Sequence, residues 1–477
     1  MTYLGRFLYF KTKEDSSFTI EGGRMKNNLT SALLLALLIP WQLFSFSATE
    51  PMQITVFVHG IMKPPDLSIS NIIKIMRSNI DNSLYYRTIY HMRRNPLLLQ
   101  AQPMQDLGLH KIYLSPDAPK SACQAVAHLY DIQLEHLNIK PEFHTYYTFG
   151  WSALLNYDRR VEGAQQLYEA LHTELDKLEE KGIKPTVRVI AYSHGGNVSL
   201  NLAKVKAEDT KKRNRDLIIN ELITVGMPIH RENDLLLSSD VFKKIFHLYS
   251  NEDAVQGMFT RRQFTHNKNT TIPGKLTQVR TRVTKKIKLK HKVKLRKEDP
   301  NYKILESHKV KLVHKDPGHI ELWCFNWGNS SSYRNSFPLN PLPMMAFIPT
   351  IIHHLHTHQP KRRNISFDYC PSECAALIRR KERLLKQAIP FLPKDIQNKM
   401  WKLAESYTPK NWTAEMYQNE IDKAMKLARE EHKQYKKSFR LKNKALAHSF
   451  ERLNSRSSEH IPHFKKIRKT HLLSAKI

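Results

Sequence analysis

Residues 187–203 read VRVIAYSHGGNVSLNLA, and this stretch decides the fold. Residues 187–191 are of strand length and carry β-branched side chains, as a buried strand does. From about Gly196 the pattern changes to one that suits a helix. Ser193 lies at the junction, next to the small residues Ala191 and Gly195. A strand that turns tightly into a helix holds the side chain at the turn above the sheet, so the stretch predicts a strand–turn–helix unit with a presented serine.

Other stretches around this unit have strand or helix length. Short apolar runs occur at 54–58, 145–149, 222–226 and 245–249, and residues 159–180 have helical apolar spacing. Continuous apolar runs are typical of strands buried on both faces. Strands that alternate with helices predict βαβ units. We therefore expect an α/β domain over residues 49–355, with a mostly parallel sheet flanked by helices.

Residues 191–195, AYSHG, resemble the nucleophile elbow of the α/β-hydrolase superfamily, with Ala191 where the family usually has a glycine. Residues 56–62, VFVHGIM, resemble the strand and oxyanion loop of the same superfamily. The resemblance implies an α/β-hydrolase fold, Ser193 as nucleophile, and no need for a metal or a cofactor. It also implies backbone N–H groups that hold an oxyanion, from His194 and from either Ile61 or Met62.

The family order places an acid and then a histidine after the serine. Asp253 follows the apolar run 245–249, and His319 lies in the loop sequence HKDPGHIELW. Both match the positions that the resemblance implies for the orienting acid and the base. Structural alternatives remain: a helix cap for Ser193, a turn or cap for Asp253, and a surface position for His319. The competing residues are Glu252 as acid and His314 or His291 as base.

The roles of some other residues stay open. His59 is interpreted as a residue that stabilises its turn. Trp151 either lines a pocket or belongs to the core. The four cysteines either pair, as an exported protein allows, or remain thiols; they are Cys123, Cys324, Cys370 and Cys374.

The net charge of +32 comes almost entirely from two segments. Residues 261–297 contain 14 lysines and arginines and no acid, and residues 375–477 contain 25 against 10 acids. Residues 279–296 alternate apolar and cationic side chains, which predicts an extended ribbon. We interpret about 261–300 as an insertion that either contacts an anionic lipid surface or packs as a solvated hairpin. Because it lacks interleaved aromatic residues, nucleic acid is a poor fit.

Residues 356–477 are expected to form a basic helical region. Helical patterns are assigned beyond Cys374, in 376–389 and in 420–450, with a disordered polar end from about Ser455. These helices are a second candidate for a membrane surface, with Trp401 and Trp412 as apolar anchors.

Residues 1–48 are expected to direct export. Residues 29–48, LTSALLLALLIPWQLFSFSA, follow a short basic stretch that begins at Met25, a candidate true start. The pattern is that of a secretory signal peptide, or of an uncleaved anchor. The protein is then periplasmic, secreted or membrane-anchored.

The sequence as a whole predicts an exported serine hydrolase, most similar to lipase-like carboxylic ester hydrolases. A thioesterase, amidase or acyltransferase would use the same three side chains. The alternative of another class is a non-catalytic, membrane-associated binding protein on the same scaffold. The oligomeric state stays open.

Overall fold

In the computed structural model the chain forms two units, Met1–Glu50 and Pro51–Ile477. Within the second unit the structure describes residues 51–62, 75–76, 78–115, 120–212, 216–257, 261–265, 274–293, 305–327, 337–358, 364–380, 387–409 and 413–457. In these ranges, no helix is both long and apolar enough to cross a membrane. The predicted signal peptide or anchor at 29–48 and the start at Met25 lie outside the described residues.

A mixed sheet, with 11 strands among the described residues, forms the centre of the unit Pro51–Ile477. The seven neighbouring strands from β9 to β3 are parallel, which confirms the predicted α/β class with a mostly parallel sheet. In spatial order the strands are β11 (Gln387–Pro390), β10 (Ala375–Arg380), β9 (Asn364–Cys370), β7 (Leu276–Val293), β6 (Phe242–Tyr249), β5 (Ile219–Val225), β4 (Thr186–Tyr192), β1 (Gln53–Val58), β3 (His144–Gly150) and β2 (Gly108–Lys111), while β8 (Leu305–Lys315) pairs with β7.

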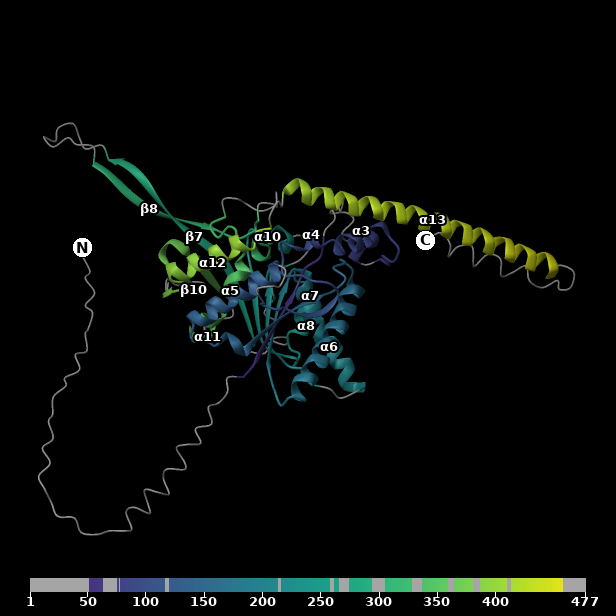
Figure 1. The fold of residues 1–477 in the computed structure, drawn as a ribbon, viewed down its shortest axis with the longest axis horizontal. Coiled ribbons are helices and arrows are strands. Elements are labelled where there is room, and N and C mark those ends of the chain that lie inside the picture. Colours follow the sequence, from purple (N-terminus) through teal and green to yellow (C-terminus); the bar gives the residue numbers. More distant parts are fainter. Residues whose placement is uncertain are drawn as a thin grey trace, which may run out of the picture. The chain divides into compact units, whose positions relative to one another are not determined.

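Helices cover both faces of this sheet (Figure 1). Successive residues of β4 show why: Val189 packs in one hydrophobic cluster and Ile190 in the other, since strand side chains alternate between faces. The Val189 face packs against α6 (Tyr157–Glu179) and α7 (His194–Lys212), and the Ile190 face against α5 (Ala122–His136), α11 (Ile348–His358) and α12 (Lys394–Ser406).

A third hydrophobic cluster joins α3 to the long helix α13. Ile89 and Met92 of α3 contribute to it, as do Ile421 and Met425 of α13. The remaining helices are α3 (Leu84–Arg93), α4 (Pro96–Leu99), α8 (Asn233–Leu236), α9 (Ala254–Gly257), α10 (His319–Trp323), η1 (Pro141–Phe143), η2 (Met344–Phe347), η3 (Pro371–Glu373) and α13 (Ala414–Ser457).

The expectation that about 261–300 is an insertion is wrong for the start of β7. Residues 276–280 of β7 pair with β6, and residues 278–283 pair with β9, so this part of β7 is a strand of the main sheet. Val279 and Val283, from the predicted apolar face, are fully buried there. Only residues 283–293 form a two-stranded ribbon, with β8, as the alternation predicted. The side chains of this ribbon from residue 285 to 293 lie outside the described residues.

The prediction of a helix over residues 376–389 is also wrong in the two parts that the structure describes, 376–380 and 387–389, which are strands. The boundary predicted near residue 355 does not end the sheet. β9 pairs with β7, and β10 and β11 continue the sheet from there. Ala376 and Ile378 of β10 are buried two residues apart, so the period that matters is the strand period. The prediction of helices farther on is confirmed by α12 and α13. The segment after Ser457, most of the predicted disordered end, lies outside the described residues.

The structure resolves three of the open alternatives. All four cysteines are unpaired. Trp151 is fully buried in the core. Trp401 of α12 packs against the Ile190-side cluster and donates its indole N–H to the Asn340 carbonyl at 3.1 Å. α12 therefore packs against the core through Trp401. Trp412 lies outside the described residues.

Candidate active site

The predicted site residues meet at one edge of the sheet because the strands that precede them are neighbours. Val58 of β1 lies beside Ala191 of β4, so the loop after β1 and Ser193 come out at the same edge. β5 and β6 continue the sheet on the other side of β4. Asp253 follows β6, which is the third strand from β1 in this order.

Ser193 occupies a tight turn between β4 and α7. Its φ of +50° is in the left-handed region, and its N–H donates to the Val225 carbonyl at 2.9 Å. A Cβ on Gly195 would lie 2.3 Å from the His59 carbonyl oxygen, and a Cβ on Gly196 would lie 2.6 Å from the Met227 sulfur. Gly195 thus lets α7 begin directly against the end of β1, and Gly196 lets it begin against the residue Met227 that follows β5. This close approach is the local reason that the sequence makes a strand–turn–helix unit.

Ser193, His319 and Asp253 form a continuous chain of hydrogen bonds. Ser193 Oγ lies 3.0 Å from His319 Nε2, and His319 Nδ1 lies 2.8 Å from Asp253 Oδ2. Ser193 and Asp253 are buried, whereas the His319 side chain keeps 15% of its surface exposed. Asp253 Oδ1 also accepts from the Gln256 N–H at 3.0 Å, so the carboxylate caps α9 as well.

The competing acids and bases lie elsewhere. Glu252 is exposed, and no hydrogen bond of its carboxylate is seen among the described residues. His314 faces the Thr284 hydroxyl, with Nδ1 2.8 Å from Oγ1. The side chain of His291 lies outside the described residues. Of the predicted acids and bases that can be placed, Asp253 and His319 are thus the pair brought to Ser193.

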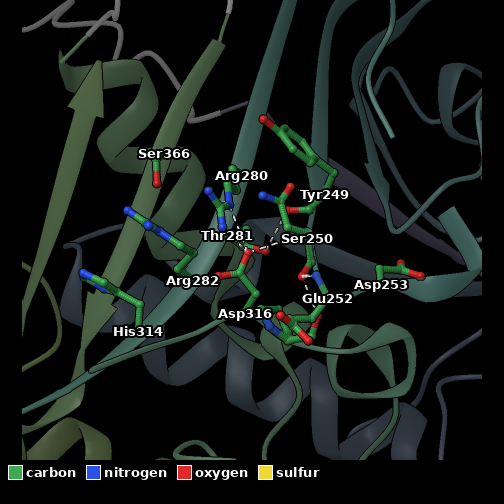
Figure 2. A network of polar contacts seen from close by, with 12 residues as sticks. Tyr249, Ser250, Glu252, Asp253, Arg280, Thr281, Arg282, His314, Asp316 and Ser366 are labelled. Carbon is green, nitrogen blue, oxygen red and sulfur yellow. Dashed lines mark hydrogen bonds and ion pairs between the residues drawn. The ribbon is translucent and has the colours of Figure 1, made fainter. Parts of the chain in front are cut away.

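A polar network ties the Asp253 loop to the His319 loop (Figure 2). The Arg280 guanidinium donates twice to Asp316 Oδ2, at 2.9 and 2.8 Å, and the Asn251 N–H donates to the same oxygen at 3.2 Å. The Ser250 hydroxyl donates to the Pro317 carbonyl. Asp316 is buried, so these donors replace the water that its carboxylate would bind at the surface. These hydrogen bonds hold the Asp253 loop against Asp316, which lies three residues before His319.

His59 lies in the loop after β1 and orients the peptide group between Gly60 and Ile61. Its Nδ1–H donates to the Gly60 carbonyl at 2.7 Å, and its Nε2 accepts from Arg93 at 3.0 Å. Burial, followed by the charge of Arg93, lowers the pKa of His59 well below its usual value, so the ring is neutral. In a trans peptide the carbonyl and N–H point in opposite directions. The bond to His59 therefore turns the Ile61 N–H away from the His59 ring.

This geometry separates the two residues that the sequence left as alternatives for the oxyanion loop. The Met62 N–H donates to the Ala153 carbonyl at 3.3 Å. The Ile61 N–H has no hydrogen-bond acceptor within the described residues. His194 is the first residue of α7, where a helix N–H has no partner inside its helix. Ile61 and His194 are hence the better-placed pair of donors.

Arg160 supports the residue that follows the serine. One of its guanidinium nitrogens lies 3.1 Å from His194 Nδ1 and 3.2 Å from His230 Nε2. Burial and then the Arg160 charge lower the pKa of His194 well below its usual value and that of His230 to about 4. The His194 ring is therefore neutral and adds no positive charge beside His319.

Sequence reasoning did not assign the three supporting arginines. Arg160 lies four and seven residues before Ala164 and Leu167, on the buried face of α6, and an arginine in an apolar stripe is the signal that identifies it. Arg93 likewise lies four residues after Ile89, on the buried face of α3. Arg280 carries no comparable signal, because β7 is basic along much of its length.

A cavity of about 560 Å³ adjoins Arg93. The hydroxyl of Ser152 in its wall has no hydrogen-bond partner among the described residues. Its lining is mainly aromatic and aliphatic and includes Tyr86, Ile89, Tyr90, Leu99 and Leu154. Arg93, Arg94 and Asp106 also line it. The cavity lies on the Met62 side of the loop after β1, since the Met62 N–H bonds to the residue between Ser152 and Leu154.

The buried histidines predict a loss of stability in mild acid. Burial lowers the pKa of His247 to about 4, and His59, His194 and His230 are shifted in the same direction. The unfolded chain takes up these protons near pH 6.5 while the folded chain does not, so their contribution is complete above pH 6.5 and is lost below it. Asp131, whose pKa burial raises to about 6, acts in the opposite direction and offsets part of the loss.

Between pH 7 and pH 5 we expect the free energy of unfolding to fall by up to about 1.4 kcal/mol per pH unit for each such histidine. Urea titrations followed by tryptophan fluorescence measure this directly. The same series in 1 M NaCl is the control, because salt screens repulsion among surface charges but not protonation of buried rings. A stability that is constant or rises toward pH 5 would contradict the prediction.

Comparison of the chain with family models, with curated proteins and with solved structures gave no match.

Proposed function

We propose that the protein is a serine hydrolase of the α/β-hydrolase fold, lipase-like and acting on carboxylic esters. The hydrogen-bond chain from Ser193 through His319 to Asp253, at 3.0 and 2.8 Å, is the observation that carries the proposal. Three side chains from distant parts of the sequence converge in the order and geometry that nucleophilic acyl transfer requires.

The fold supports the same reading. The serine follows a central parallel strand, the acid follows β6 two positions farther along the sheet, and the histidine lies beyond β7 and β8. The loop after β1, which resembles the oxyanion loop, lies at the same edge as the serine. The sheet order thereby brings together the segments that resemble the superfamily.

In the proposed reaction His319 Nε2 accepts the Ser193 proton as Oγ attacks the ester carbonyl. Asp253 stabilises the resulting imidazolium through Nδ1–H, and the Ile61 and His194 N–H groups bind the oxyanion. His319 then gives the proton to the leaving alcohol. Water then attacks the carbonyl of the acyl-enzyme while His319 Nε2 accepts a proton from it. His319 gives this proton to Ser193 Oγ as the bond to the acyl group breaks, which restores the free serine.

The proposal leaves other acyl substrates as alternatives, since a thioester, an amide or an acceptor alcohol would use the same groups. A non-catalytic binding protein on this scaffold is the alternative of another class. We also propose that the protein is exported, on the basis of residues 29–48 alone.

A fluorophosphonate probe distinguishes the enzyme from the binding protein. Purified residues 49–477 should be labelled on Ser193, found by peptide mapping, and the label should be lost in His319→Ala. An ester panel of increasing acyl length, with a thioester and an amide, then identifies the substrate class. Failure to label, with near-ultraviolet circular dichroism showing a folded protein, would favour the binding protein.

The ion pair between Arg280 and Asp316 predicts that a substitution of Arg280 lowers the rate of the reaction without unfolding the protein. Arg280→Met leaves the buried Asp316 carboxylate without its two arginine bonds and loosens the loop that leads to His319. We expect kcat to fall about 10- to 100-fold with little change in KM, because small misplacements of a reacting group are costly. Arg280→Lys should recover part of the rate.

Arg282→Met is the matched control for Arg280→Met. Arg282 makes an equally close pair with the buried Asp368, at 2.7 Å, but this pair joins β7 to β9 and touches neither loop. The control should lower thermal stability and keep the kcat of the folded protein. Equal kcat losses in both variants would mean that stability alone is responsible.

A further inference from the structure

Helix α13 has a half that packs against the body of the protein and a half that is exposed to solvent. In the docked half, Ile421, Ala424 and Ala428 are buried against the body of the protein. Glu431 bonds to Arg87 at 3.1 Å, and the ring of Tyr435 lies 5.3 Å from the Arg87 guanidinium carbon.

From residue 436 to 449 every residue of α13 is exposed, and the helix continues past the body of the protein (Figure 1). Three large apolar side chains in this part face solvent: Phe439 is 51% exposed, Leu441 60% and Leu446 54%. Phe439 and Leu446 lie four and eleven residues after Tyr435, a helical spacing, so they continue the stripe that packs against α3. An exposed stripe of this kind has a partner outside the described residues or outside the chain.

The charge of this segment indicates which partner it fits. Residues 432–450 contain six lysines and arginines and no acid. Two copies of such a helix would repel each other, so a second copy of the chain is a poor partner. An anionic surface is complementary, and a cationic helix with exposed aromatic and leucine side chains is the pattern of helices that lie in a lipid–water interface.

Nucleic acid is the other large anion, and the apolar side chains argue against it. Contacts with phosphates need only the cations, and base stacking needs a series of aromatic rings, of which residues 436–449 contain one, Phe439. Transfer of Phe439 and Leu446 from water to acyl chains is favourable, whereas a phosphate backbone offers these side chains no apolar environment.

We infer that residues 436–449 of α13 are a docking segment for an anionic lipid bilayer, on which the segment lies parallel to the surface with Phe439 and Leu446 inserted. The inference uses no catalytic property and stands or falls independently of the proposed hydrolase. α12, the other helix considered for this role, is excluded by its packing in the core.

The test is flotation of residues 49–477 with vesicles of phosphatidylcholine alone or with one third phosphatidylglycerol. Removing 1–48 excludes binding by the apolar stretch 29–48, and the remaining residues include the whole compact unit. We expect binding only to the anionic vesicles, weakened by salt. Lys436→Gln/Lys437→Gln/Arg440→Gln should lower the partition coefficient roughly 100-fold. Phe439→Ser/Leu446→Ser should lower it at least 10-fold with no change in net charge.

The matched control is Lys177→Gln/Lys181→Gln/Lys184→Gln, which removes three exposed cations from the region of the α6 C-terminus. It should bind vesicles as the parent protein does. Equal losses in the control and in the α13 charge variant would show that only net charge matters and would overturn the inference. Failure of the parent protein to float, or tight binding of a 20-nucleotide RNA that survives Phe439→Ser/Leu446→Ser, would also overturn it.

Discussion

Ser193→Ala should reduce kcat for a short-chain ester by about 10⁶-fold, to the level that binding and oxyanion stabilisation alone provide. Ser193 Oγ is the atom that His319 Nε2 contacts, at 3.0 Å, and alanine removes that atom without adding volume. Ser193 already has a positive φ, and alanine is close to serine in size, so the fold should be kept. Steady-state ester hydrolysis and circular dichroism measure the two properties.

Ser199→Ala is the control for this variant. Ser199 is a fully buried serine on the same helix, α7, and its hydroxyl donates to the Gly195 carbonyl at 3.0 Å, away from His319. It should hydrolyse esters nearly as fast as the parent protein. An active Ser193→Ala protein would refute the assignment of the nucleophile, whatever the control does.

Asp253→Asn should reduce kcat by about 10⁴-fold while leaving the fold intact. Oδ1 accepts from the Gln256 N–H, so the amide oxygen of asparagine takes that position, and its NH₂ faces His319 Nδ1. His319 Nδ1 must then be a hydrogen-bond acceptor, so the ring proton moves to His319 Nε2, which faces Ser193 Oγ. In that tautomer the ring cannot take the serine proton.

Glu252→Gln tests the same question on the adjacent carboxylate. Glu252 is exposed, and the change is chemically equivalent to Asp253→Asn. The structure predicts a rate within about twofold of the parent, since the side chain makes no contact with His319. A large loss in Glu252→Gln with a small loss in Asp253→Asn would reverse the assignment of the acid.

Local patterns were sufficient for the elements that build the site. The strand before Ser193 and the helix after it were predictable because strand runs, small turn residues and helical spacing are properties of neighbouring residues. The same holds for β1, β3, β5, β6 and α6, each predicted within a few residues. The positions of Asp253 and His319 followed from a resemblance in chain order, which the 3.0 and 2.8 Å contacts now place next to Ser193.

The segments after residue 260 needed tertiary context. The alternation in β7 is the same along its length, but residues 276–283 are inside the sheet and 283–293 form a ribbon, because only the first part has β6 and β9 as neighbours. Residues 375–380 have enough helix formers to suggest a helix, yet they pair with β9 because that edge of the sheet would otherwise expose its backbone groups.

The proposed nucleophile, Ser193, and the order of the helices and strands around it could therefore be predicted from the sequence, since both depend on residues close together in the chain. The choice of Ile61 over Met62 depended instead on a distant acceptor, the Ala153 carbonyl. The roles of Arg93, Arg160 and Arg280 likewise depended on partners 34 to 36 residues away along the chain. Charge and hydrogen bonding act through space, so only the tertiary structure decides which distant groups come within about 3 Å of each other.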